Sequence, residues 1–293
     1  MGSNGAPFVD VFVVSDVHAG SIFGLWPPDF KLADGSVYRL NKGQDYLWKC
    51  WLHLRDRLTV AIDTKSINPA AVVFLGDGID GRQEAQRATE AVTVRLSDQK
   101  EAFVAAMQCL LEPFKGLPVY GIAGTEYHDQ RSADTLEDAL KDLNAESYEG
   151  IGSGRYCHEI LDLDVFGKVI NFSHHIPALT GLYRATAIDR EAIWSALAGE
   201  EGKSPKADVL VRGHVHYFVH VEHESKHGVI VPAWQLQTRF MRKRSVYRML
   251  PNLGAVIIRV FKEEAWHDDK IQIYKFIYPL PPYRPTKLRL AEA

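Results

Sequence analysis

The amino-acid sequence predicts an α/β fold, because short apolar runs rich in β-branched residues alternate with stretches that have helical periodicity. The runs at 8–15 and 70–75 are apolar throughout, which is typical of strands buried on both faces of a mainly parallel sheet. Further strands are predicted at 118–122, 156–164, 167–172, 209–211, 228–231, 254–261 and 271–280. Helices are predicted at 44–63, 83–112, 134–143 and 188–198.

The composition is that of a globular protein, with 46% hydrophobic and 24% charged residues among 293. This length suits a single domain over residues 1–293. Residues 20–43 are rich in glycine, proline and aromatic side chains, which predicts an irregular insertion. Pro281 and Pro282 end the last predicted strand, so residues 281–293 are expected to form a C-terminal extension.

Charge and cysteine content narrow the functional classes. A formal net charge of −3 argues against a protein that binds nucleic acid or membranes through its overall charge. The three cysteines are widely spaced and odd in number, which favours a reducing compartment. No apolar run is long enough to span a bilayer, and the N-terminus does not resemble a signal peptide. We therefore expect a cytoplasmic protein without membrane contact; the oligomeric state is undetermined.

Aspartate and histidine residues follow several predicted strands at the point where each strand ends. Because carboxyl ends of parallel strands gather along one edge of a sheet, these side chains are expected to lie together. Carboxylate and imidazole ligands suit manganese, iron or zinc and do not select a thiolate-preferring ion. The candidate ligands are Asp16, His18, Asp77, His174, His214 and His216.

The order and spacing of five motifs resemble those of the calcineurin-like metallophosphoesterase superfamily. The motifs are DVH (16–18), GD (76–77), GTEYHD (124–129), SHHIP (173–177) and GHVH (213–216), and the resemblance spans residues 8–217. It implies a four-layer α/β/β/α sandwich that carries a centre of two divalent metal ions. Manganese is the expected metal, with iron or zinc as alternatives. The stretches around HHIP and PAWQLQTRFM are similar to those of predicted phosphoesterases from phage and prophage genomes.

The resemblance also implies a role for each matching residue. Asp16, His18 and His216 would hold one metal ion. His174 and His214 would hold the other. Asp77 would bridge the two ions and is therefore expected to be essential for catalysis.

The third motif departs from the family pattern, in which an asparagine ligand is followed directly by a histidine. Thr125 and Glu126 stand near the asparagine position, and two extra residues precede His128. Glu126 is chemically the better candidate for the missing ligand. His128 corresponds to the family histidine that faces the leaving group, and His175 is a candidate substrate contact.

The implied activity is hydrolysis of a phosphodiester by metal-activated water, on a nucleic acid or a nucleotide. Arg184 and Arg239 are candidate phosphate contacts, the latter in the basic and aromatic stretch RFMRKRSVYR (239–248). The alternative for both arginines is ordinary surface charge. Phosphomonoester hydrolysis, or a binding scaffold that retains the fold with little catalysis, are the alternative functions.

Overall fold

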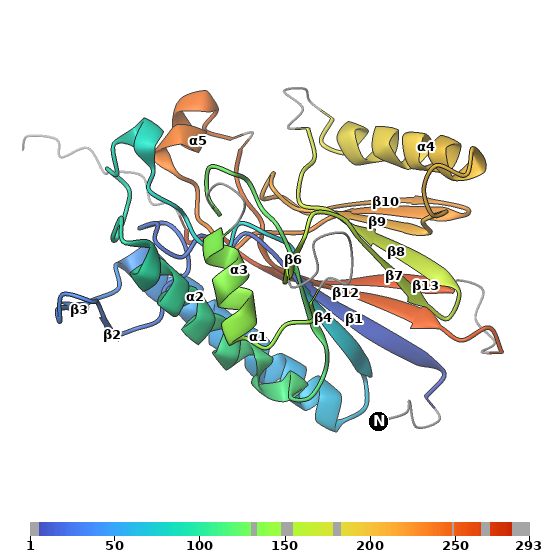
Figure 1. The fold of residues 1–293 in the computed structure, drawn as a ribbon, viewed down its shortest axis with the longest axis horizontal. Coiled ribbons are helices and arrows are strands. Elements are labelled where there is room, and N and C mark those ends of the chain that lie inside the picture. Colours follow the sequence, from blue (N-terminus) through green and yellow to red (C-terminus); the bar gives the residue numbers. More distant parts are fainter. Residues whose placement is uncertain are drawn as a thin grey trace, which may run out of the picture.

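The computed structural model describes residues 6–129, 134–147, 155–177, 183–247, 249–264 and 270–282 (Figure 1). Residues 283–293, most of the predicted C-terminal extension, lie outside this part, as does Arg248 of the basic stretch. Two larger sheets form the centre of the molecule, and helices lie on their outer faces (Figure 1).

The first sheet has six strands. Their spatial order is β13 (Ile271–Tyr278), β12 (Leu253–Phe261), β1 (Phe8–Val14), β4 (Pro69–Phe74), β5 (Val119–Ile122) and β6 (Cys157–His158). The four strands from β1 to the edge strand β6 are parallel to one another, whereas β12 runs antiparallel to β1 and to β13.

The second sheet has five strands, of which the three central ones are parallel and the two outer ones antiparallel to their neighbours. Its order is β10 (Val219–His223), β11 (Lys226–Ile230), β9 (Val209–Arg212), β8 (Lys168–Phe172) and β7 (Leu161–Val165). The predicted strand 156–164 is therefore two strands, because the chain leaves the first sheet after β6 and enters the second at β7.

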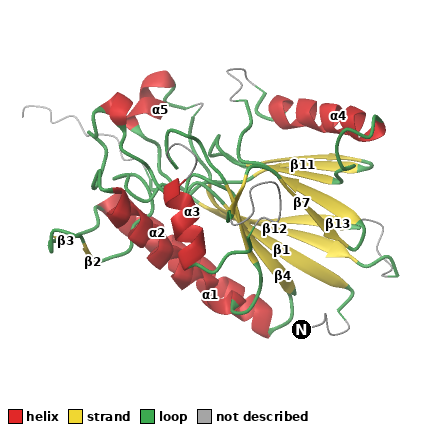
Figure 2. Cartoon of the chain, viewed as in Figure 1, coloured by secondary structure: helices red, strands yellow, loops and turns green. Residues whose placement is uncertain are grey.

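The layers follow the order helix, sheet, sheet, helix (Figure 2). Apolar side chains of α1 (Lys42–Asp63), α2 (Leu96–Leu111) and α3 (Asp134–Asp142) cluster with β1, β4 and β12 on the outer face of the first sheet. A second apolar cluster joins the two sheets, and a third places α4 (Thr186–Glu200) against the second sheet. The predicted four-layer α/β/β/α sandwich is thus confirmed.

Helix α1 shows how local sequence sets these elements. The Asn41 side chain accepts hydrogen bonds from the first turn, and Gln44 completes a capping box with it. The apolar residues at helical spacing are buried, and among them Trp51 donates its indole N–H to the carbonyl of Ala106 at 3.0 Å. The Trp51 ring also packs edge-on against Trp234, which ties α1 to the segment after β11.

The predicted helix at 83–112 is wrong over its first half. Only residues from Leu96 onward are α-helical, and a short 3₁₀ turn covers Glu84–Gln86. Gln83, Arg87 and Ala88 have φ angles of 51°, 52° and 56°, which no right-handed helix accommodates. Backbone hydrogen bonds instead tie this stretch to the segment after His18, from the N–H of Ile22 to the carbonyl of Glu90 and from the N–H of Val92 to the carbonyl of Gly20, so tertiary contacts override its helical propensity.

Several smaller elements complete the chain. The predicted insertion at 20–43 contains a two-stranded hairpin of β2 (Phe30–Lys31) and β3 (Val37–Tyr38), whose aromatic rings pack on buried Trp26. Strand β10 was not predicted, nor was the short helix α5 (Arg239–Arg244). Within the described residues no helix has the length and apolar character needed to cross a bilayer.

A buried ion pair offers a test of this fold. Arg259 donates two hydrogen bonds, of 2.8 and 2.9 Å, to Asp10, whose exposure is 1%. Arg259→Leu leaves a buried carboxylate unpaired, so the free energy of unfolding should fall by about 3–5 kcal/mol in a urea titration. The exposed pair Lys49–Asp45 is the matched control, and Lys49→Ala should cost less than about 1 kcal/mol. Equal losses in the two variants would contradict this ranking.

Candidate metal centre

Strand ends from both sheets converge on one point. Asp16 and His18 follow β1, and Asp77 follows β4 in the first sheet. From the second sheet, His174 follows β8, and His214 and His216 follow β9. The structure therefore brings together all six candidate ligands that follow the predicted strands.

Distances define three groups of side chains within this cluster. In each group the potential ligand atoms lie within 4.8 Å of one another. The groups are Asp16, His18 and His216; His18, Asp77 and His128; and Asp77, His174 and His214. Asp77 belongs to two groups, and its Oδ2 lies 3.1 Å from His174 Nε2 and 3.9 Å from His18 Nε2.

Asp16 forms the other link between the groups. Its Oδ1 lies 3.2 Å from His216 Nε2 and 4.0 Å from His174 Nε2. The Asp16 Oδ1 and the His174 Nε2 are buried and make no hydrogen bond within the described structure. Buried polar atoms without hydrogen bonds are rare, and buried charges are paired or coordinate metals. This nitrogen and oxygen donor set fits divalent cations such as manganese, iron or zinc.

The pKa values of the histidines in the cluster also indicate a site for a divalent cation. Burial opposes charge on His18, but the neighbouring carboxylates of Asp16, Asp80 and Asp77 outweigh it and raise the pKa of His18 to about 10. Burial is likewise outweighed at His174, whose pKa is raised to about 9 by Asp77 and Asp16. The carboxylates thus hold protons on imidazoles, and a divalent cation at the same place would displace those protons.

His214 differs from these two histidines. Burial lowers the pKa of His214 to about 4, because the attraction of Asp77 and Asp16 is partly cancelled by His174 and His216. The neutral ring keeps a lone pair available at neutral pH, which is the form that binds a metal.

The backbone around the ligands is strained. Asp16, His18, Asp77, His214 and His216 all have positive φ angles, between 49° and 69°. Residues with side chains rarely occupy this region, and such strain is concentrated at functional sites. Each turn re-aims a side chain at the end of its strand. Close packing around the ligands favours glycine at position 213, since a Cβ there would lie 2.7 Å from Ser15 Oγ.

Asp129 holds the loop after β4 against the loop after β5. Its Oδ2 accepts hydrogen bonds from the backbone N–H groups of Asp77 and Gly124, both at 2.9 Å, and its Oδ1 accepts one from Gly78 at 3.0 Å. Thr125, near the family asparagine position, donates from its backbone and from its hydroxyl to Asp77 Oδ1, at 2.6 and 2.9 Å. The GTEYHD motif therefore orients Asp77 through Thr125 and Asp129.

Sequence reasoning also missed Asp80, which orients His18. Its Oδ1 lies 3.1 Å from His18 Nδ1, so the Nε2 of that ring faces the metal groups. Gln235 and Gln83 donate to the Asp80 carboxylate from outside the cluster. An outer carboxylate that fixes the orientation of a metal-ligating histidine is a common arrangement. The position of Asp80 in GDGID, three residues after Asp77, was the available signal.

The remaining predicted site residues lie around the cluster. His128 packs edge-on against His18, and its Nδ1 lies 3.1 Å from the carbonyl oxygen of Asp80. His175 is exposed, with its ring 5.5 Å from that of His214. Glu126 is exposed and belongs to none of the three groups. Its role as a ligand stays a prediction.

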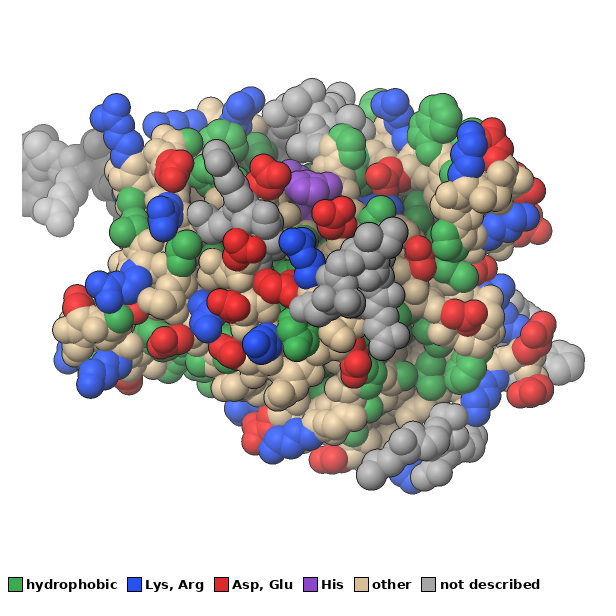
Figure 3. Space-filling view, viewed as in Figure 1, with side chains coloured by type: hydrophobic (Ala, Val, Ile, Leu, Met, Phe, Trp, Pro, Cys, Tyr) green, Lys and Arg blue, Asp and Glu red, His purple; other side chains and the backbone are tan. Residues whose placement is uncertain are grey.

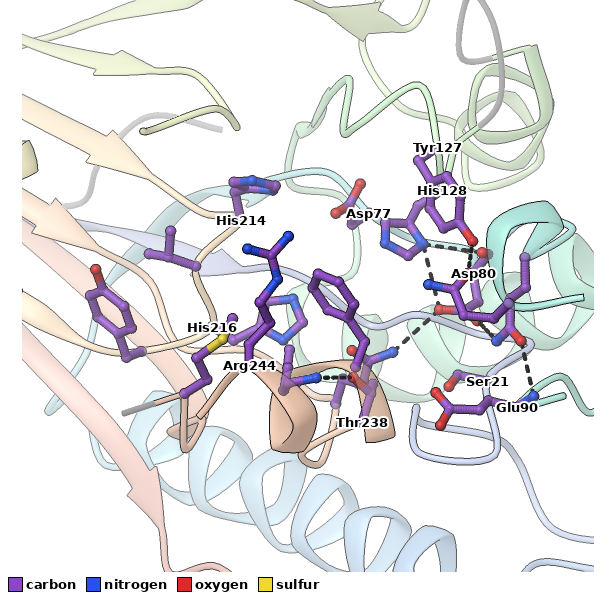
Figure 4. A pocket seen from close by; sticks show the side chains of 18 of the residues that line it. Ser21, Asp77, Asp80, Glu90, Tyr127, His128, His214, His216, Thr238 and Arg244 are labelled. Atoms are coloured by element: carbon purple, nitrogen blue, oxygen red, sulfur yellow. Dashed lines mark hydrogen bonds and ion pairs between the residues drawn. The ribbon is translucent and has the colours of Figure 1, made fainter. Parts of the chain in front are cut away.

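A pocket of about 540 Å³ opens beside the cluster (Figure 4). Asp77, His128, His214 and His216 lie on its wall, so the metal groups face this space. Arg184 and Arg244 also line the pocket, and Figure 4 shows Arg244 pointing into it from α5. Arg239 is not among the lining residues: it is 61% exposed, and its Nε lies 3.6 Å from Glu90.

Comparisons with known proteins add little to this picture. No family model and no curated protein matches the chain. The solved structures to which the chain is similar include an archaeal phosphodiesterase, with 13% identity, a TM-score of 0.39, and coverage of 92% of this chain and 100% of that one. A Zn²⁺ complex of Vps29 from Entamoeba histolytica has 11% identity, a TM-score of 0.40, and coverage of 92% and 99%.

A predicted phosphoesterase from Streptococcus pneumoniae has 11% identity, a TM-score of 0.35, and coverage of 92% and 99%. Because all three TM-scores lie below 0.5, the class of this protein rests on its own layers and side chains. It is a four-layer α/β/β/α sandwich with clustered aspartates and histidines at the strand ends that could bind metal ions.

Asp129→Asn tests whether Asp129 holds the loop after β4 against the loop after β5. The amide nitrogen would replace one oxygen that accepts backbone N–H groups, so the loop that carries Asp77 should loosen and Mn²⁺ affinity should fall by about 10–100-fold. Isothermal titration calorimetry measures this change. Asp164 accepts a backbone N–H at a turn between β7 and β8, and Asp164→Asn is the control that should keep wild-type affinity. Unchanged Mn²⁺ affinity in both variants would exclude a role for the Asp129 hydrogen bonds in metal binding.

Proposed function

We propose that this protein is a metal-dependent phosphoesterase that hydrolyses phosphodiester bonds at a centre of two divalent cations. The observation that carries the proposal is the position of Asp77, whose carboxylate belongs to two of the three groups of potential ligands. A carboxylate shared in this way is suited to bridging two ions. The kinship with calcineurin-like metallophosphoesterases of phage type and the cytoplasmic location remain predictions from the sequence.

The residues would divide between the two ions as their groups suggest. Asp16, His18 and His216 would hold one ion, and His174 and His214 the other, with Asp77 between them. When bound, two such cations polarise a phosphoryl group and lower the pKa of a nearby water molecule. Thr125 keeps Asp77 in place through the two hydrogen bonds to its Oδ1, which leaves Oδ2 directed at His174 and His18.

His128 is the candidate proton donor to the leaving oxygen. A carbonyl oxygen can only accept a hydrogen bond, so the contact with Asp80 assigns the proton of the neutral ring to Nδ1 of His128. Nε2 then carries a proton only when the ring is an imidazolium, and that proton is the one His128 would donate to the leaving oxygen; burial lowers the pKa of His128, which makes the imidazolium a readier donor. The ring of His128 lines the pocket together with Asp77, so a phosphate bound at the metal groups would lie close to this ring.

The pocket favours a phosphodiester that carries a nucleobase. Its volume lies within the range of about 300–1,000 Å³ that is usual for small ligands, and one nucleotide unit or a strand end suits this size. Arg184 and Arg244 supply positive charge for phosphate, since a guanidinium matches phosphate geometry. Tyr127 and Phe240 supply aromatic surface, on which an unpaired base can stack.

On the face that Figure 3 shows, acidic and basic side chains of the described residues are interspersed, and exposed histidine atoms lie between acidic groups. This mixture agrees with the formal net charge of −3. Recognition of an anionic substrate therefore depends on the local charges of the pocket, and long-range attraction of a polyanion is not expected.

The first test uses bis(p-nitrophenyl) phosphate as a diester probe. Chelator-treated protein should be inactive, added Mn²⁺ should restore turnover, and Asp77→Asn should lower kcat at least about 100-fold because the shared carboxylate is lost. Release of p-nitrophenol measures the rate. Circular dichroism and metal analysis of the same samples establish that each protein is folded and loaded.

Absence of turnover in folded, metal-loaded wild-type protein would contradict the diesterase proposal. Turnover of p-nitrophenyl phosphate alone would then point to a phosphomonoesterase. Metal binding without hydrolysis of either probe would favour a binding scaffold.

A second test addresses the base-binding wall. Phe240→Ala should raise the KM for a dinucleotide about 5–150-fold, the range expected for one lost base–aromatic stack, with little change for the corresponding abasic sugar phosphodiester, which has no ring to stack. Steady-state kinetics on both substrates measure the difference. Arg242 lies on the same short helix but packs over Phe23 and does not line the pocket, so Arg242→Ala is the control. Equal effects of Phe240→Ala on both substrates would argue against base stacking.

A further inference from the structure

A second group of metal-ligand side chains lies on the hairpin of β10 and β11, apart from the candidate metal centre. It consists of His220, Glu222 and His227, whose potential ligand atoms all lie within 4.8 Å of one another. None of these residues belongs to the three groups around Asp77, and none lines the pocket. The proposed phosphoesterase activity makes no use of them.

The strand register places the three side chains on one face of the hairpin. Glu222 pairs directly with His227, and His220 pairs with Val229. Because side chains alternate with period two, His220 and Glu222 share the face to which His227 and Val229 point. Val229 is buried in the cluster between the sheets, so this face is turned toward the first sheet.

The distance between the two imidazoles fits coordination of one ion. His220 Nε2 lies 3.1 Å from His227 Nδ1. Two nitrogens bound tetrahedrally to zinc at about 2.0–2.1 Å are about 3.4 Å apart, so a small shift would admit an ion. Glu222, which is exposed, supplies an oxygen from the same side. The competing explanation is a simple N–H···N hydrogen bond between two neutral rings.

Charged groups from two sheets act on the ring of His220. Glu222 lies on the same strand, and the positive charge of Lys275 acts from the first sheet. Lys275 reaches this region from β13 in the first sheet, and its ammonium group lies over the ring of Phe218.

We propose that His220, Glu222 and His227 form a separate site for one Zn²⁺ ion, with two imidazole nitrogens and one carboxylate as protein ligands. The ion would clip β10, an edge strand with a single neighbour in its sheet, to β11. This hairpin starts three residues after His216 and ends five residues before Gln235, which donates to Asp80. Zinc at the hairpin would therefore stiffen the connection between two parts of the candidate metal centre.

The experiment counts zinc in the full-length protein. Wild type and variants are dialysed against buffered free Zn²⁺, and bound zinc is measured by mass spectrometry. His227→Ala should bind one equivalent less than wild type. His223 lies on the same hairpin, but its Nε2 contacts Asp189, so the control His223→Ala should bind as much zinc as wild type.

Two further variants keep the test informative if His227→Ala does not fold. Glu222→Gln removes the charge of an exposed ligand and should weaken zinc binding at this site at least about tenfold, since loss of even an outer partner of a metal ligand has an effect of this size. Lys275→Met removes a nearby positive charge and should therefore tighten zinc binding at this site.

The same zinc content in wild type, His227→Ala and Glu222→Gln would overturn the proposal in favour of the hydrogen-bonded pair. The readout is a difference of one equivalent and needs no turnover. It therefore stays informative if the phosphoesterase proposal fails.

Discussion

The burial of two carboxylates, Asp16 and Asp77, at one junction of the two sheets is the constraint that shapes this protein. Their exposures are 0% and 1%, and an uncompensated carboxylate in such a place would be very costly. Backbone and hydroxyl donors on Ser15 and Thr125 satisfy one oxygen of each. The other oxygens face imidazoles, which is the arrangement from which metal affinity arises.

That constraint reaches the architecture because the ligands come from both sheets. The apolar layer between the sheets, which includes Val13, Val73, Phe172 and Val211, fixes how the end of β1 stands relative to the end of β9. Well-packed interiors transmit small displacements, so the spacing of the ligand groups depends on packing far from any ligand. Positive φ angles at the ligands add strain that this rigid support maintains.

The pocket is built differently from the metal groups. Residues of the metal groups on strand ends form one part of its wall, and most of the rest comes from the irregular segment around Gln83–Glu90 and from the stretch that includes α5. Loops on a rigid scaffold commonly carry specificity, because they can vary without disturbing the core. The hairpin with His220 and His227 lies between the GHVH turn and the Gln235 segment, and its rigidity would influence both.

The sequence by itself indicated an α/β fold, most of its strands and the six candidate ligands at the strand ends, because apolar runs and the residues that end them are local signals. The four layers were implied by the resemblance of five motifs to a known family. It could not determine that 83–95 leaves the helix, since the backbone hydrogen bonds that hold this stretch, between Glu90 and Ile22 and between Val92 and Gly20, join segments far apart in the sequence. The tertiary structure alone assigned Asp129 and Asp80 their places, placed Arg244 in the pocket and brought His220 beside His227. These relations join residues that are close in space only because strands pair and sheets pack, and one chain's residue pattern does not record such pairings.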